Sequence, residues 1–505
     1  MGLLGILAGL LVLMVLAFRG WSVLLLAPLA ALVAAAFSGQ PLLASWTQTF
    51  MTAASGFVAQ FFPLFMLGAL FGKLMADSGS VDAIAEAMTR VLGPQRAVLA
   101  VVLAGALVTY GGVSLFVAFF VLVPMAMKLF QAGEVPRRLI PAAIALGTTT
   151  FTMSALPGTP AVQNAIPMPF FGTTAFAAPG LGLIASAIML GWGLFWLGRE
   201  VSAARARGEG HGASGDAAPA PDGDGTQPAA LAPAMTTRPA RIGDNDVVRE
   251  KAANAAPFDV TELERGQASE ARPSVGVALL PLGVVVLVNL LMSFVVLPRL
   301  DTSYLSDPRW GGVALPAVGG VWSIIVALLA AIGTLVACNV TRLRGLRATM
   351  DAGVNAAALP ILSVASLVGF GAVVASLPAF EAVSEWVLGI GHGNPLASLA
   401  VATTVLSSLT GSASGGMSIA LGALGETYMQ QAQLIGLSPQ ALHRVSVIAA
   451  GTLDTLPHNG AIVTLLTLCG LTHRHSYRDI VMVGVIGPVL ALVSLVVLAS
   501  LFGAF

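Results

Sequence analysis

The sequence predicts an all-α polytopic membrane protein made of two inverted repeats, each with about five transmembrane crossings and one re-entrant hairpin. Three observations support this fold class. Hydrophobic residues make up 56% of the 505 positions and charged residues only 10%, whereas a soluble domain carries about 25% charged residues. Apolar runs of nearly membrane-spanning length recur along the chain. The two halves of the chain also align with each other.

Each apolar run predicts a membrane helix, because about 20 apolar residues cover the hydrocarbon core. The first run has no basic segment before it and no small-residue cleavage site, so we interpret it as a retained helix rather than a signal peptide. Four of the runs are interrupted by Gly or Pro. The runs are 2–18, 22–39, 48–76, 96–130, 137–172, 178–198, 274–297, 312–339, 352–377, 395–429, 439–472 and 479–503.

A polar segment separates two membrane halves of similar size. Residues 201–273 are rich in Ala, Pro, Gly and Asp, a composition that cannot bury a core and that predicts a disordered linker. We therefore expect a first membrane repeat over 1–200 and a second over 274–505.

Internal similarity between the halves is typical of transporters. Three stretches of the first half recur in the same order in the second, at an offset of about 300 residues. The pairs are "LFGKLMADSGSVDAIAEAMTRVLG" (70–93) with "GFGAVVASLPAFEAVSEWVLGIG" (369–391), "TYGGVSLF" (109–116) with "TGSASGGM" (410–417), and "TMSALPGTPAVQN" (152–164) with "TLDTLPHNGAIVT" (452–464).

Basic residues predict the orientation in a bacterial inner membrane. The loop "RLRGLR" (342–347) should be cytoplasmic, and counting back through two spans places the linker in the cytoplasm as well. The basic residues of the first half share that side only if 96–130 is a re-entrant hairpin. The matching segment 395–429 then opens to the outside, and both termini are periplasmic.

Four breaks inside apolar segments are the candidate binding site. Broken backbone at membrane depth is costly unless it lines a cavity, and helix N-termini that end there attract anions. A kink or a close helix contact explains any one break taken alone. The candidate substrate-binding residues at the four breaks are Thr109, Tyr110, Gly111, Gly112, Ser114, Ser154, Thr159, Asn164, Thr410, Ser412, Ser414, Gly415, Thr455 and Asn459.

Asp454 is the one acidic residue well inside an apolar segment, which makes it the candidate proton-coupling group, with His458 as its partner. The alternatives are a helix N-cap at the unwound turn for Asp454 and a structural hydrogen bond for His458. No Lys or Arg is expected at the depth of the breaks, so an anion would be held by helix ends and hydroxyl groups.

Several function classes are excluded or disfavoured. Twenty-four basic and 24 acidic residues cancel, so no basic field favours nucleic acid. The two cysteines lack metal or redox spacing, no metal site or cofactor is expected, and no P-loop indicates an ATP-driven pump. An intramembrane enzyme would have only the Asp454–His458 pair. The prediction is a proton-coupled symporter of a small organic anion in a lipid bilayer; sodium coupling is the alternative, with Asp454, Asn459 and Ser414 as ligands.

The sequence resembles the gluconate permease (GntP-type) family of the ion transporter superfamily. The similarity lies in "GALVTYGGVSLFVAFFVLVPMA" (105–126), "SALPGTPAVQNAIP" (154–167) and "TLDTLPHNGAIVTLL" (452–466). It implies a scaffold domain and a transport domain with two opposed hairpins, an elevator movement and a homodimer. Gluconate carriers of the family look to have a Pro/His-rich turn where this chain has "LPGTP". The "DTLPHNG" turn is similar to that of carriers of short hydroxy-monocarboxylates such as 3-hydroxybutyrate.

Overall fold

The computed structural model describes residues 2–18, 21–211, 262, 265–390, 394–457 and 459–505, and every regular element in this part of the chain is a helix. The all-helical prediction is therefore confirmed. Seven helices are long and apolar enough to cross a membrane, or eight if Ser80–Leu92 and Pro94–Tyr110, bent by 103°, form one span. The sequence predicts about five crossings per repeat. The difference arises because three further apolar helices are shorter than the roughly 20 residues that a full crossing needs.

The first half begins with a pair of apolar helices and ends with a long one. Its helices are α1 (Gly2–Phe18), α2 (Val23–Phe37), α3 (Leu42–Ala44), the π-helical η1 (Ser45–Phe50), α4 (Met51–Asp77), α5 (Ser80–Leu92), η2 (Pro94–Arg96), α6 (Ala97–Tyr110), α7 (Leu115–Ala132), η3 (Arg137–Leu139), α8 (Ile140–Thr148), α9 (Phe151–Ser154), α10 (Val162–Ala165), α11 (Pro167–Phe171) and α12 (Pro179–Ala206).

The second half has a closely similar succession. Its helices are α14 (Val275–Leu291), the π-helical η6 (Met292–Val296), η7 (Leu297–Arg299), η8 (Ser303–Ser306), η9 (Pro308–Trp310), α15 (Leu315–Asn339), α16 (Leu346–Asn355), α17 (Ala358–Ser376), α18 (Phe380–Gly389), α19 (Pro395–Thr410), α20 (Ala413–Ile435), α21 (Pro439–Thr452), α22 (Gly460–Leu468), α23 (His473–Val481), the π-helical η10 (Met482–Ile486) and α24 (Gly487–Phe502).

The order of helix types recurs in the two halves. In each half a long helix (α4 or α17) is followed by a short amphipathic helix (α5 or α18), and both short helices fall in the aligned stretches 70–93 and 369–391. A helix pair joined by a tight turn follows, α6–α7 or α19–α20, and then a helix interrupted by an irregular segment. This succession supports the predicted repeat, whose inversion stays a prediction.

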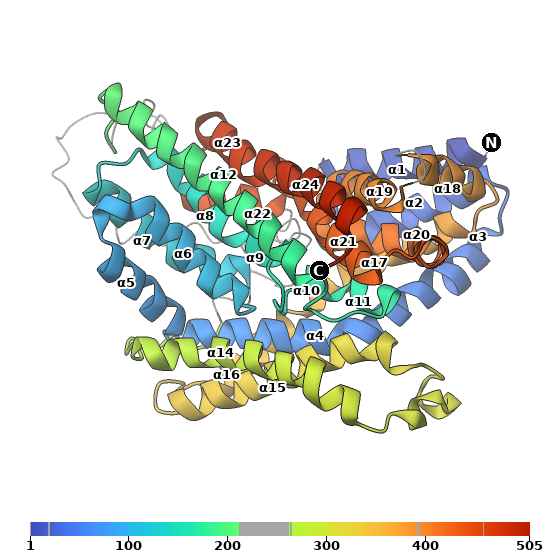
Figure 1. Ribbon diagram of the computed structural model, residues 1–505, viewed down its shortest axis with the longest axis horizontal. Helices are drawn as coiled ribbons and strands as arrows, with labels where there is room; N and C mark the ends of the chain where they lie inside the picture. Colours follow the sequence, from blue (N-terminus) through green and yellow to red (C-terminus); the bar gives the residue numbers. More distant parts are fainter. Residues whose placement is uncertain (1, 19–20, 212–261, 263–264, 391–393, 458) are drawn as a thin grey trace, which may run out of the picture.

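Helix α4 packs against α15, α16 and α17, which places it alongside much of the second half. Figure 1 shows α4 with the yellow helices α15 and α16 along the lower edge of the molecule. On the opposite side α12 lies against α24 (Figure 1). Helix α7 of the first half also contacts α22 of the second. The two halves are therefore interleaved rather than separate units.

Both ends of the predicted linker contact the helical part of the chain. Helix α12 continues to Ala206, six residues past the boundary predicted at 200. At the other end the Ser269 N–H donates to the Asp77 carbonyl oxygen over 2.8 Å, and Arg272 pairs with Glu86. The residues 212–261 and 263–264 lie outside the described part.

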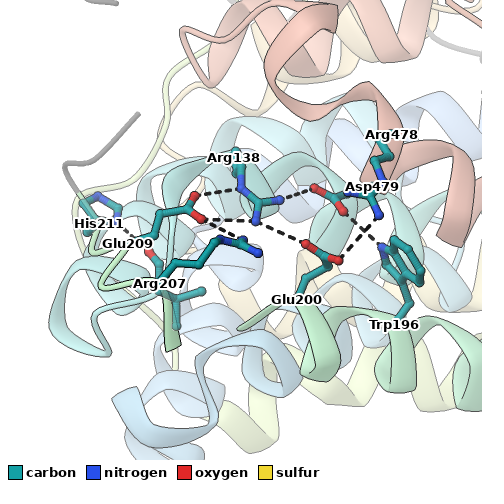
Figure 2. A network of polar contacts seen from close by, with 9 residues as sticks. Arg138, Trp196, Glu200, Arg207, Glu209, His211, Arg478 and Asp479 are labelled. Atoms are coloured by element: carbon teal, nitrogen blue, oxygen red, sulfur yellow. Dashed lines mark hydrogen bonds and ion pairs between the residues drawn. The ribbon is translucent and has the colours of Figure 1, made fainter. Parts of the chain in front are cut away.

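A network around Arg138 joins the start of the linker to the second half (Figure 2). The guanidinium donates to Glu209 over 2.8 Å, to Asp479 over 2.7 Å and to Glu200 over 3.2 Å. The Trp196 indole N–H also donates to Asp479, over 3.0 Å. The hydrogen bond from Arg138 lowers the pKa of Glu209 below its ordinary value. Arg138 therefore connects its own segment to the C-terminal end of α12 and to α23.

We predict that residues 212–261 contribute nothing to the stability of the fold. Replacing them with a flexible Gly/Ser spacer should leave the melting temperature in detergent unchanged, because their composition offers little apolar surface to bury. The matched comparison is Arg138→Met in the full-length chain. It should lower the melting temperature by at least about 3 °C, since it removes the guanidinium from the buried carboxylates of Glu200 and Asp479. A larger drop for the spacer variant than for Arg138→Met would contradict the prediction.

Candidate functional site

The first and second breaks lie against each other. Helix α6 ends at Tyr110, whose hydroxyl donates to the Pro157 carbonyl oxygen over 2.9 Å. Gly112 has φ +95°, a conformation that L side chains rarely adopt, and a Cβ atom there would lie 2.7 Å from the Pro160 ring. Glycine is therefore required where the turn of the first hairpin meets the irregular segment after α9.

The third and fourth breaks meet at Asp454. Its Oδ1 atom accepts from the Ala413 N–H and from the Asn459 side-chain amide, both over 3.0 Å. Ala413 is the first residue of α20, and the Ser412 side chain accepts from the Gly415 N–H over 3.1 Å. Asp454 and Ser412 thus cap the N-terminus of α20, where a negative charge is favourable. The carboxylate caps a helix of the neighbouring hairpin rather than its own unwound turn.

Asn459 also connects the third and fourth breaks. Its Nδ2 group donates to the Gly411 carbonyl oxygen over 3.2 Å as well as to Asp454, and its Oδ1 atom accepts from the Ala461 N–H over 2.8 Å. Asn459 is the N-cap of α22 and is 1% exposed. His458 lies outside the described residues.

Arg444 on α21 binds the segment around the second break. The expectation that no Lys or Arg lies at the depth of the breaks is wrong, because Arg444 is fully buried and donates to the Ser154 carbonyl oxygen over 3.3 Å. Its other N–H groups donate to the carbonyl oxygens of Ala175 and Ala177 and to the Asn164 side chain. All five donors of the guanidinium are thereby matched to protein oxygens, which is what makes its burial tolerable.

Asn164 holds the second break rather than facing open space. Its Nδ2 group donates to the carbonyl oxygens of Thr159 and Ala175, both over 3.0 Å. Its Oδ1 atom lies 3.2 Å from both Arg444 Nη1 and His443 Nε2. The amide is therefore fully used by the fold, and we assign Asn164 a positioning role.

Most of the predicted hydroxyl groups bond to nearby backbone. Thr109, Ser154 and Thr410 each donate to the carbonyl oxygen four residues earlier in the chain, over 2.8 to 3.0 Å. Thr159 accepts from the Ala161 N–H. Thr455 faces Gly484 of η10, since a Cβ atom on that glycine would meet its hydroxyl.

The remaining predicted residues lie at the hairpin turns. Ser114 occupies the N-cap position of α7 but its side chain makes no capping hydrogen bond, and its hydroxyl has no hydrogen-bond partner among the described residues. Ser414 lies 3.3 Å from Ser412, hydroxyl to hydroxyl. Gly111 is packed on Leu282 of α14, and Gly415 is packed on Leu367 of α17. The structure thus joins the four breaks in pairs, and among the described residues no hydrogen bond runs directly from the turn of one hairpin to the turn of the other.

Comparisons with known proteins point to membrane transporters. The GntP family permease profile matches residues 1–177. The uncharacterized transporter YxjC of Bacillus subtilis (strain 168) is 38% identical over 489 residues, which is 95% of each chain.

Two solved structures are similar in fold. One is the crystal structure of the Alcanivorax borkumensis YdaH transporter, with a TM-score of 0.50, 17% identity and coverage of 89% of this chain and 88% of that one. The other is Neisseria gonorrhoeae MtrF, described as illuminating a class of antimetabolite efflux pumps, with a TM-score of 0.50, 13% identity and coverage of 92% and 84%. At these identities the similarity concerns the fold alone.

We predict that Arg444→Met destabilises the protein strongly. The substitution leaves the buried carbonyl group of Ala177 without the two N–H donors that Arg444 supplies, at a cost of about 1–3 kcal/mol for an unsatisfied group. The melting temperature should fall by about 5 °C or more. Arg347→Met is the control, because the Arg347 side chain is 96% exposed and its pair with Asp351 has little effect. Equal melting temperatures for the two variants would show that Arg444 does not hold the second break.

Proposed function

Because this chain belongs to the GntP family of permeases, we propose that it is a proton-coupled symporter of a small organic anion, either gluconate-like or a short hydroxy-monocarboxylate such as 3-hydroxybutyrate. Membership of this permease family directly supports a multi-pass secondary transporter rather than an enzyme. We further propose an elevator movement, a homodimer and a location in the bacterial inner membrane. The linker is then cytoplasmic and both termini are periplasmic.

The observation that carries the proposal is the carboxylate of Asp454 at the N-terminus of α20. The partial positive charge there is about half an elementary charge, enough to favour one anion but not two close together. Protonation of Asp454 removes its negative charge from this helix end. A substrate carboxylate can then approach the same N-terminus, so that substrate and proton bind together. Symport follows from this competition between two negative charges.

Charge also supports a monocarboxylate as substrate. Arg444 is the buried cation beside the breaks, and all of its N–H groups are already donated to protein oxygens. An anion in the site would therefore be compensated mainly by helix N-termini and hydroxyl groups. Such partial charges suit one carboxylate better than the two or three of a di- or tricarboxylate.

Sodium coupling is the alternative, and one contact disfavours it. The Asn459 Nδ2 group donates hydrogen bonds to Asp454 Oδ1 and to the Gly411 carbonyl oxygen. A Na⁺ bound through these two oxygens would compete with the amide for their lone pairs. Proton coupling needs no such competition.

Uptake into proteoliposomes tests the proposal. We expect saturable uptake of a labelled monocarboxylate from a panel that includes 3-hydroxybutyrate, gluconate, succinate and citrate, stimulated by an inward proton gradient. A sodium gradient alone should give no accumulation. Preferential uptake of citrate or succinate, or accumulation driven only by sodium, would refute the proposed substrate class or coupling ion.

We predict that Asp454→Asn uncouples transport from the proton gradient. The amide oxygen can still accept from the Ala413 N–H, but the side chain can no longer release a proton. Gradient-driven accumulation should fall at least about tenfold, the loss expected when a coupling free energy of about 1.4 kcal/mol or more is removed, while exchange of substrate between the two sides continues.

Asp307→Asn provides the matched control, since Asp307 lies in an exposed loop and pairs with Arg309. It should accumulate substrate like the wild type. If Asp454→Asn also concentrates substrate like the wild type, Asp454 serves only as the cap of α20.

A further inference from the structure

A cavity of about 220 Å³ lies between α4, α11, α17 and α20. Phe57, Phe61 and Phe170 are its aromatic lining residues, and Gln60 and Ser418 are its polar ones. Its volume is below the roughly 300–1,000 Å³ of sites for drug-sized ligands, so its occupant must be small. None of the residues that line it is charged.

Ser418 on α20 is the first sign that this cavity binds a ligand. The residue is 2% exposed, and its hydroxyl has no hydrogen-bond partner within the described part of the chain. A buried polar group without a partner costs about 1–3 kcal/mol. A ligand that hydrogen-bonds Ser418 would recover this free energy on binding.

Gln60 on α4 is the second sign. It is the one polar side chain in the helix between Ser55 and Lys73, and it is exposed. Polar side chains within membrane spans are costly when they face lipid, and they usually face the protein interior or a water-filled cavity. Gln60 is one of the residues that line this cavity, and its side-chain amide is able to donate to an anion.

The cavity is connected to the N-terminus of α20 by hydroxyl groups on one face of that helix. Ser414 precedes Ser418 by one helical turn, so the two side chains are about 5–6 Å apart. Ser414 is in turn 3.3 Å from Ser412, which caps the helix. A short polar track thus runs from the cavity toward the carboxylate of Asp454.

We propose that this cavity is a binding station for the transported anion, about two helical turns from the capped end of α20. Ser418 and Gln60 donate hydrogen bonds to the carboxylate or hydroxyl oxygens, and the three phenylalanines contact a short carbon chain. The lining therefore selects a small monoanion with an aliphatic segment. This inference rests on the proposed function and adds the residues that select the substrate.

Gly422→Leu tests the station by filling it. Gly422 lines the cavity, and a Cβ atom there would meet nothing within 4 Å, so the variant should fold normally. Gly333→Leu on α15 is the control, because Gly333 is equally open but lies outside the cavity. With 3-hydroxybutyrate as the probe, Gly422→Leu should reduce initial uptake at least tenfold, and Gly333→Leu should keep the wild-type rate and melting temperature.

Ser418→Ala gives an independent measurement that does not depend on filling the cavity. Loss of one hydrogen bond to a charged group predicts a rise in KM of about tenfold with little change in maximal rate. Ser363→Ala is the matched control, since Ser363 also has a buried hydroxyl without a partner but does not line the cavity. Its KM should stay at the wild-type value.

The outcomes separate the station from the proposed function. If wild-type protein takes up no carboxylate of the panel, the proposed function fails and the station fails with it. If the wild type transports 3-hydroxybutyrate and both Gly422→Leu and Ser418→Ala keep KM and maximal rate within twofold, the station alone is overturned. If Gly422→Leu does not insert, the KM of Ser418→Ala against that of Ser363→Ala decides the question.

Discussion

Backbone hydrogen bonding at the four interrupted helices is the constraint on which the rest of the structure depends. A helix that ends inside a membrane leaves N–H and C=O groups that water cannot satisfy. Here backbone groups at the second and third breaks are paired with other segments: the Pro157 carbonyl with the hydroxyl of Tyr110, the Ser154 carbonyl with Arg444, and the Ala413 N–H at the start of α20 with Asp454. The breaks are therefore stable only together, which explains why the two halves of the chain are interleaved rather than laid side by side.

Composition decides where the helices lie, and the sequence therefore predicts them well. The runs 2–18 and 312–339, for example, correspond to α1 and α15 within three residues at each end. The amphipathic helices α5 and α18 were not among the predicted spans, because their apolar residues occupy only one face. The family resemblance is confirmed by the 38% identical relative.

The chemistry of the site is harder to predict, because partners are set by tertiary structure. The sequence identifies Asp454 as exceptional, but its partner Ala413 is 41 residues away on another hairpin. Arg444 was missed because it lies only five residues after Pro439, near the predicted start of an apolar run, where basic residues are ordinary. The adjacent pair His443-Arg444, one turn inside an otherwise apolar helix, was the available signal. Asn164 is of a residue type that often binds substrate, yet its hydrogen bonds to Thr159 and Arg444 give it a structural role.

The buried guanidinium of Arg444 also limits how the molecule can move. From α21 in the second half it donates five buried hydrogen bonds to residues between 154 and 177 of the first half. Water cannot reach these bonds to replace them. Sliding α21 against that segment would break them all at once. We therefore expect α21 and this segment to move together in any conformational change of the protein. Arg444 thereby couples the position of α21 to that of the second break, so we expect a shift on one side of the site to move the other side as well.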